Sequence, residues 1–207
     1  RSLLAFLVMS RERTHTRDLL AGTFWPDLPE PEARRRLSRA LWHIRARIDR
    51  DVRERHIMTA GGVVFISPQA AIQLDIEQFR NLLSESRSES VSVPEEESRL
   101  LAQAASLYSG DLLEGFYDDW VLASREELRQ DFLRAIRRLC DLTTATGDYE
   151  AALTHARLLT RHDPWGEDGH RRVMRLAVLL GHHTDAIRQY ELCKAILRQE
   201  LDTEPSR

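Results

Sequence analysis

Arginine is concentrated between Arg34 and Arg55, where nine arginines stand among only three acidic residues. A guanidinium group can bridge two phosphate oxygens, and it can also donate two hydrogen bonds to the O6 and N7 atoms of guanine. Because so few carboxylates are present to neutralise these cations, a groove lined by phosphates is a suitable partner. The alternative is a solvated face of an arginine-rich protein, since Lys194 is the only lysine among the 30 cationic residues.

A long helix predicted over residues 32–50 would carry most of these arginines. At about 100° per residue, its apolar residues share one stripe that can face the core. That stripe consists of Leu37, Leu41, Ile44 and Ile48. We expect the remaining surface to lie in the major groove of DNA, where side chains contact phosphates and base edges. The expected contacts are Arg34, Arg35, Arg36, Arg39, Trp42, His43, Arg47 and Arg50.

A β-hairpin is predicted after this helix, because two apolar segments over residues 56–60 and 63–67 flank Gly61-Gly62. It would form a wing that follows the DNA backbone into the minor groove, with Thr59, Gly61 and Gly62 as contacts. Two shorter helices are predicted before the long one, over residues 3–10 and 17–24. The predicted order is that of a winged helix-turn-helix, with two helices, an arginine-rich helix and a hairpin. The hairpin therefore favours DNA contact by the arginine-rich helix over the alternative of a solvated face.

The segment Trp25–Pro31 connects the second and third of these helices and contains three prolines in seven residues. Proline restricts the backbone, so we expect a stiff, non-helical connector. The segment carries Asp27 and Glu30 but no cation, and a phosphate backbone would therefore repel it.

After Pro68 the pattern is helical to the end of the chain. Alternating serines from Ser84 to Ser92 predict a flexible connection between two helices. The segments that begin at Gly147 and Gly181 are similar and lie 34 residues apart, which is the tetratricopeptide period. The sequence thus predicts a mainly α protein. A truncated winged helix-turn-helix with a hairpin wing would occupy residues 1–70, and an all-α, tetratricopeptide-like domain residues 71–207.

The charges are distributed unevenly between these two parts. Residues 1–66 hold 13 arginines and 8 acidic residues, whereas residues 67–207 hold 17 cationic and 25 acidic residues. A basic first third followed by an acidic remainder indicates an anion-binding module attached to a second domain.

Several motifs resemble one family along nearly the whole chain. Trp25-Pro-Asp, the segment from Arg34 to Arg45 and the Gly61-Gly62 hairpin resemble the OmpR-type winged helix of SARP-like transcriptional activators, the Streptomyces antibiotic regulatory protein class. The second part resembles the bacterial transcriptional activator domain that follows the winged helix in this class. Its matching motifs are Leu74-Asp-Ile-Glu-Gln-Phe, the segment from Tyr108 to Trp120, and Leu201-Asp-Thr-Glu-Pro.

The resemblance implies a sequence-specific, cytoplasmic activator that binds double-stranded DNA and recruits RNA polymerase. It also implies dimer or regulatory contacts through the helical repeats, and we expect a homodimer. In related winged helices the loop that matches Trp25–Pro31 stands beside the polymerase, so Trp25, Asp27 and Glu30 are the expected polymerase contacts. The alternative is a rigid spacer whose Trp25 packs in the core.

Two departures from the family affect these expectations. The family has a small β-sheet before the first helix, whereas this chain begins inside that helix, so we expect the sheet to be cut off or disordered. The positions of Trp42-His43 usually hold Ser-Arg, and Ala46 stands where a second arginine is usual. The loss of two cations predicts a different target sequence, and either a weaker contact or a pH-sensitive one through His43.

Other classes of protein receive little support. The common nucleotide-binding, metalloprotease and hydrolase motifs do not occur, so we expect no enzyme, no cofactor and no metal, the pair His182-His183 included. Cys140 and Cys193 are expected to be buried thiols, and the apolar run Leu3–Met9 is too short to span a membrane. Two alternatives stay open: a tetratricopeptide scaffold for protein partners, and a regulatory fragment of a larger nucleotide-binding regulator.

Overall fold

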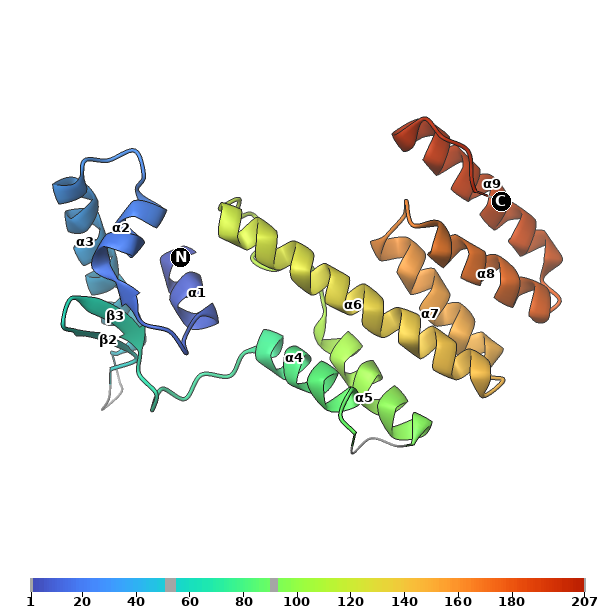
Figure 1. The fold of residues 1–207 in the computed structure, drawn as a ribbon, viewed down its shortest axis with the longest axis horizontal. Coiled ribbons are helices and arrows are strands. Elements are labelled where there is room, and N and C mark those ends of the chain that lie inside the picture. The colour runs from blue at the N-terminus through green and yellow to red at the C-terminus, as the bar shows by residue number, and fades with distance from the viewer. Residues whose placement is uncertain (1, 51–54, 90–92, 207) are drawn as a thin grey trace. The chain divides into compact units, whose positions relative to one another are not determined.

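The computed structural model describes residues 2–50, 55–89 and 93–206. Its chain forms two compact units, Arg1–Gln73 and Leu74–Arg207. The first unit combines helices with a small sheet and the second is helical (Figure 1), which confirms the predicted fold class. The boundary that we predicted after residue 70 lies close to the division between the units.

The first unit has the element order of a winged helix. Its elements are α1 Ser2–Met9, β1 His15–Thr16, α2 Arg17–Phe24, α3 Glu30–Ile48, β2 Ile57–Ala60 and β3 Val63–Ile66. The sheet is antiparallel with the order β1-β3-β2. Sequence patterns did not predict β1, because a strand of two residues is too short to show an alternation.

One core joins the elements of this unit. Leu7 of α1, Leu20 of α2 and Leu37 of α3 are buried against the hairpin residues Ile57 and Val64. The predicted stripe of α3 does face this core, although its C-terminal members Ile44 and Ile48 are only partly buried. The outward face of α3 is therefore fixed relative to the hairpin.

Two helix boundaries differ from our predictions. α3 begins at Glu30 and ends at Ile48, whereas we predicted residues 32–50. Pro31 lies in the first turn, where the amide hydrogen that proline lacks would have no helical partner, so it does not prevent the earlier start. Glu30 consequently belongs to the helix and not to the proline-rich connector.

The helical unit contains α4 Asp75–Ser86, α5 Pro94–Leu107, α6 Asp119–Ala145, α7 Tyr149–His162, α8 Glu167–Leu179 and α9 His183–Leu201. Each helix packs against the next one along the chain (Figure 1). Gly147 precedes α7 and Gly181 precedes α9, each with a positive φ. The predicted repeat that begins at Gly147 is the helix–turn–helix unit α7–α8, whereas the one that begins at Gly181 contains the single helix α9.

The predicted serine-rich connection is shorter than expected. Ser84 and Ser86 lie in the last turn of α4, and Ser86 is buried with its hydroxyl donating to the Leu83 carbonyl oxygen at 2.9 Å. Ser90 and Ser92 lie outside the described residues. Cys140 and Cys193 are both buried and free, as predicted.

Among the described residues, none of the helices is sufficiently long and apolar to span a membrane.

Candidate nucleic-acid interface

The outward face of α3 carries the side chains that we predicted to bind DNA. The predicted contacts on α3 are all exposed, and they are Arg34, Arg35, Arg36, Arg39, Trp42, His43 and Arg47. Arg50 is also exposed, but it follows the helix, which ends at Ile48. Leu37 and Leu41 on the opposite side are fully buried, so the helix cannot rotate to hide its arginines. All of the predicted helical contacts are thus accessible to a partner, although Arg50 does not belong to the helix.

Acidic neighbours divide these arginines into two groups. Arg34 forms ion pairs with Asp18 of α2 at 2.8 Å and with Glu30 at 2.7 Å, and the hydrogen bond that Arg34 donates to Asp18 raises the pKa of Arg34. Arg36 lies 3.7 Å from Glu32. Within the described part of the chain, no carboxylate pairs with the others, which are Arg35, Arg39, Arg47 and Arg50.

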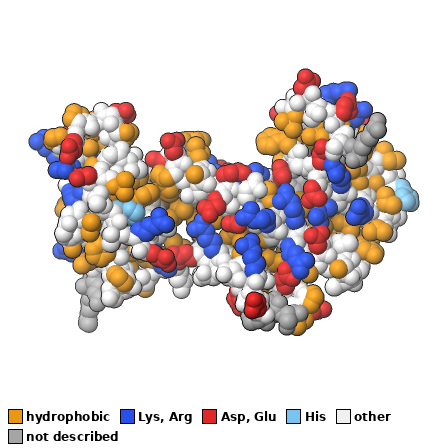
Figure 2. All heavy atoms as spheres, in the orientation of Figure 1, with side chains coloured by type: hydrophobic (Ala, Val, Ile, Leu, Met, Phe, Trp, Pro, Cys, Tyr) orange, Lys and Arg blue, Asp and Glu red, His pale blue; other side chains and the backbone are white. Residues whose placement is uncertain are grey.

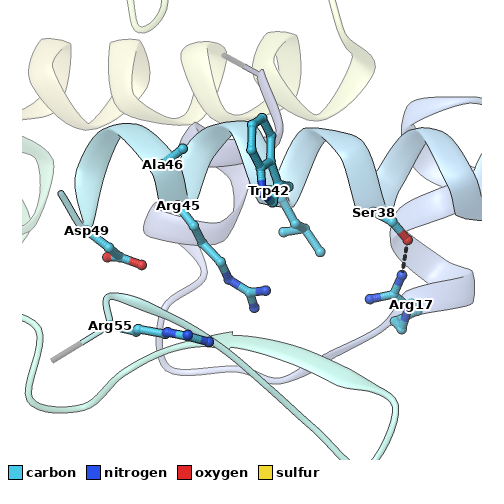
Figure 3. A pocket seen from close by; sticks show the side chains of 8 residues that line it. Arg17, Ser38, Trp42, Arg45, Ala46, Asp49 and Arg55 are labelled. Atoms are coloured by element: carbon cyan, nitrogen blue, oxygen red, sulfur yellow. Dashed lines mark hydrogen bonds between the residues drawn. The ribbon is translucent and has the colours of Figure 1, made fainter.

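A groove of about 520 Å³ separates α3 from the hairpin (Figure 3). Its walls combine three arginines and one carboxylate with uncharged polar and apolar side chains. The lining residues are Arg17, Ser38, Leu41, Trp42, Arg45, Ala46, Asp49 and Arg55. Three guanidinium groups around one open groove create a positive potential where a wing and a helix meet.

Arg45 joins α3 to the wing. Its Nε donates to the Ile57 carbonyl oxygen at 3.1 Å, and its Nη2 donates to Thr59 Oγ1 at 2.5 Å. Burial lowers the pKa of Arg45, and the nearby charge of Arg55 lowers it further. An arginine remains charged despite such a shift, so Arg45 contributes both a tether and a positive charge.

Arg17 makes a corresponding connection at the start of α2. Its Nη2 donates to Ser38 Oγ at 2.6 Å, and its backbone N–H donates to the Gly62 carbonyl oxygen at 3.2 Å. Arg17 therefore holds α2, α3 and the turn of the wing together. Thr16 caps this helix, with its hydroxyl accepting a hydrogen bond from the Leu19 N–H.

The predicted wing contacts lie at the exposed end of the hairpin. Gly61 and Gly62 form the turn with φ of 57° and 81°, as a type I′ turn requires. Thr59 is exposed, but its hydroxyl already accepts the hydrogen bond from Arg45. At the base of the hairpin, Asp49 accepts hydrogen bonds at 2.9 Å from both the backbone N–H and Nδ1 of His56.

The sequence patterns did not predict that Arg17, Arg45 or Arg55 would belong to the interface. Arg45 lies at the edge of the helical wheel, and only the position of the hairpin shows that this edge faces a groove. Arg17 is separated from Ser38 by 21 residues, so no local pattern connects them. The excess of arginine between Arg34 and Arg55 was the one sequence feature that pointed to an anion-binding surface in this region.

The predicted polymerase contacts occupy three different environments. Trp25 is half-buried and packs against the core of the first unit, with Phe24 at a ring distance of 6.2 Å. Asp27 is exposed between α2 and α3. Glu30 lies in the first turn of α3 and pairs with Arg34, so it is not a free acidic group of the connector.

Most arginines of the helical unit pair with carboxylates, and Figure 2 shows cationic and acidic side chains intermixed on the face in view. Arg138 binds Glu97 through two hydrogen bonds of 2.7 Å, and Arg129 binds Glu126 at 2.9 Å. In the described residues, no group of three or more His, Cys, Asp or Glu side chains is placed to hold a metal ion.

The chain is similar to one protein family and to proteins of known structure. The profile of the bacterial transcriptional activator domain matches residues 74–207. No curated protein matches the sequence. The structure is similar to that of Mycobacterium tuberculosis EmbR, solved in complex with a low-affinity phosphopeptide, with a TM-score of 0.73 and 23% identity over 99% of this chain. The match covers 55% of EmbR, so this chain spans about half of that protein's length.

Proposed function

We propose that this chain, which belongs to the family of the bacterial transcriptional activator domain, binds DNA sequence-specifically and activates transcription. In this chain that domain follows a winged helix, as it does in SARP-type activators. One observation carries the proposal. Arg35, Arg39 and Arg47 form an exposed basic face on α3, Arg50 follows directly after the helix, and no described carboxylate neutralises them. On the helical unit most exposed arginines pair with a carboxylate, as Arg138 does with Glu97, and the exceptions among the described residues are Arg87, Arg157, Arg161 and Arg175.

The basic face and the groove have distinct roles in this proposal. α3 enters the major groove, where outward arginines neutralise phosphates or donate two hydrogen bonds to guanine. Arg17, Arg45 and Arg55 line the groove next to the hairpin and hold the DNA backbone between α3 and the wing. The tethers from Arg17 and Arg45 keep the wing in place before DNA binds, so little conformational freedom is lost on binding.

The double substitution Arg35→Ala and Arg39→Ala tests the proposal. Each change is expected to weaken binding by about 1–3 kcal/mol if the arginine contacts a base, and by less if it contacts only a phosphate. For each lost phosphate contact, the slope of log K against log salt concentration should fall by about 0.9. Gel-shift or anisotropy titrations of the folded variant measure both quantities.

The matched control is Arg161→Ala with Arg175→Ala, which removes two exposed arginines from α7 and α8. The control should bind DNA like the unaltered chain. Equal affinity of both double variants would contradict the assignment of α3. Failure of the unaltered chain to bind any DNA would favour the scaffold alternative, in which the repeats bind a protein.

RNA polymerase is the second partner that we propose. Pro26 and Pro29 restrict the connector between α2 and α3, Trp25 anchors it, and Asp27 projects into solvent. We therefore assign the polymerase contact to Asp27, whereas the ion pair with Arg34 occupies Glu30.

Contacts between two copies of the chain are assigned to the helical unit, because stacked helix pairs offer extended binding surfaces. The mass of the complex on DNA with two sites would show whether two copies bind.

In vitro transcription tests the polymerase contact. Asp27→Ala should leave DNA affinity unchanged and lower transcription from a target promoter at saturating protein. Glu12→Ala is the control, since it removes another exposed carboxylate from the same unit. Full transcription with Asp27→Ala would show that the connector is a spacer only.

A further inference from the structure

Trp42 places a large apolar ring on the outward face of α3. Its exposed fraction is 63%, although the residues around it on this face are mainly arginines. A phosphate is strongly hydrated and offers no apolar surface, so an indole gains little by facing one. An indole gains most where a partner buries its ring against another apolar group.

Two exposed neighbours of Trp42 lie beside its ring on this face. The His43 ring meets the indole edge to face, with ring centres 4.8 Å apart and planes at 74°. Ala46 follows one turn later and is also exposed. Trp42 and Ala46 border the groove. Figure 3 shows their side chains on the side of α3 farther from the hairpin, whereas Arg45 and Asp49 point toward it. Trp42 and Ala46 thus form an apolar strip on the side of α3 that carries Arg35 and Arg39.

Only one base-edge group in the major groove matches such a strip. The exposed edges of guanine, cytosine and adenine offer hydrogen-bond donors and acceptors, whereas thymine adds a 5-methyl group. Apolar side chains on recognition helices contact this methyl group. The arginines on the same face hold the helix against the phosphates, which brings the strip close to the bases.

We propose that Trp42, together with Ala46, contacts the 5-methyl group of thymine and so selects a T·A pair at one position of the target. This inference rests on the proposed function, since it requires α3 to lie in the major groove. It makes Trp42 a specificity-determining residue, whereas Arg35 and Arg39 supply affinity.

Uracil substitution isolates the methyl group, because uracil keeps every hydrogen-bonding group of thymine and lacks only that methyl. Target sequences are first selected from random DNA with the unaltered 207-residue chain. Each thymine of the selected site is then replaced by uracil in turn. At one position, or two adjacent ones, the affinity is expected to fall about fourfold, which corresponds to the burial of one methyl-sized group.

Variants of Trp42 connect that effect to the indole. In Trp42→Ala the same uracil substitution should change the affinity by much less than fourfold, whereas Trp42→Phe should retain most of the effect. Trp165→Ala is the control, since Trp165 is another exposed tryptophan, 52% exposed, in the helical unit. It should leave the uracil effect unchanged.

The possible outcomes separate the inference from the proposed function. If no DNA sequence is enriched, both are wrong. If a sequence is enriched but no uracil substitution lowers the affinity, the inference alone is overturned. The same holds if the uracil effect is equal in Trp42→Ala and the unaltered chain. In that case the indole serves another contact, such as one with a protein.

Discussion

Arg34 and Arg39 are both exposed on α3, but their surroundings give them different roles. Arg34 lies between two carboxylates, one on α2 and one in the first turn of α3. Exposed ion pairs of this kind contribute little to stability, but they keep the guanidinium group occupied and orient it toward the protein. No described carboxylate pairs with Arg39, so its charge is available to a phosphate or a guanine.

Substitution by alanine should have opposite effects on the stability of the first unit at Gly62 and at Gly22. Gly62 has a φ of 81° in the wing turn, so Gly62→Ala should destabilise the unit by about 1–2 kcal/mol. Gly22 lies within α2 with negative φ and no atom within 4 Å of an added Cβ. Gly22→Ala should therefore stabilise the helix by about 0.5–1 kcal/mol. Urea unfolding measures both effects, and a stabilising Gly62→Ala would contradict the assigned turn.

The helices and the hairpin turn with regular residue patterns were predictable from the sequence, whereas the two-residue strand and the end of α4 were not. The stripe of α3 and the Gly61-Gly62 turn follow from periodicity and turn chemistry, and the structure has both. The two-residue strand β1 depends on pairing with β3, which is distant in the sequence. Ser86 joins α4 because its hydroxyl finds a carbonyl partner within the helix, although a run of serines favours a loop.

The same limit applies to the candidate interface. The exposed residues of α3 follow from its core stripe, which the sequence contains. The pairing of Arg34 with Asp18 and of Arg45 with Thr59 depends on how α2 and the wing pack against α3. Tertiary contacts therefore decide which arginines are free, and periodicity along one helix cannot show them.

The junction of α5, α6 and α7 contains a histidine with a predictable response to pH. The His162 ring packs edge to face against Phe132 at 4.8 Å and against Tyr108 at 5.8 Å. Burial lowers the pKa of His162, and the charge of Arg161 lowers it further. The folded state thus disfavours the protonated ring. The neutral His162 ring therefore stabilises the folded state. This stabilisation is complete above the pKa of about 6.5 that histidine has in the unfolded chain, and it is lost as the pH falls below that value.

We therefore expect the melting temperature of the protein to fall between about pH 7.5 and pH 5.5. His162→Gln cannot take up this proton, so its melting temperature should depend less on pH. His183→Gln is the control, because His183 is exposed at the start of α9 and should leave the dependence unchanged. An identical pH dependence in His162→Gln and the unaltered protein would contradict this role of His162.

At the scale of the whole molecule, each unit has its own core. The buried residues of the first unit all precede Ile72, and the two buried clusters of the helical unit begin with Phe79 and Cys140. None of these clusters combines described residues from both units. Ile72 packs against the first core, and Arg11 donates a hydrogen bond to its carbonyl oxygen at 2.9 Å. We therefore propose that the boundary lies after Gln73 and not after residue 70.

Residues 74–207 should consequently fold without the winged helix. Each helix of this unit buries its apolar face on the next one, so its stability depends on contacts between neighbours that a cut at Gln73 leaves intact. The isolated segment should show a helical circular dichroism spectrum and one cooperative thermal transition. Residues 71–207 should be no more stable than residues 74–207, because Ile72 would lack the core of the first unit against which it packs. A non-cooperative transition, or a marked gain in stability from residues 71–73, would show that the two units share a folding core.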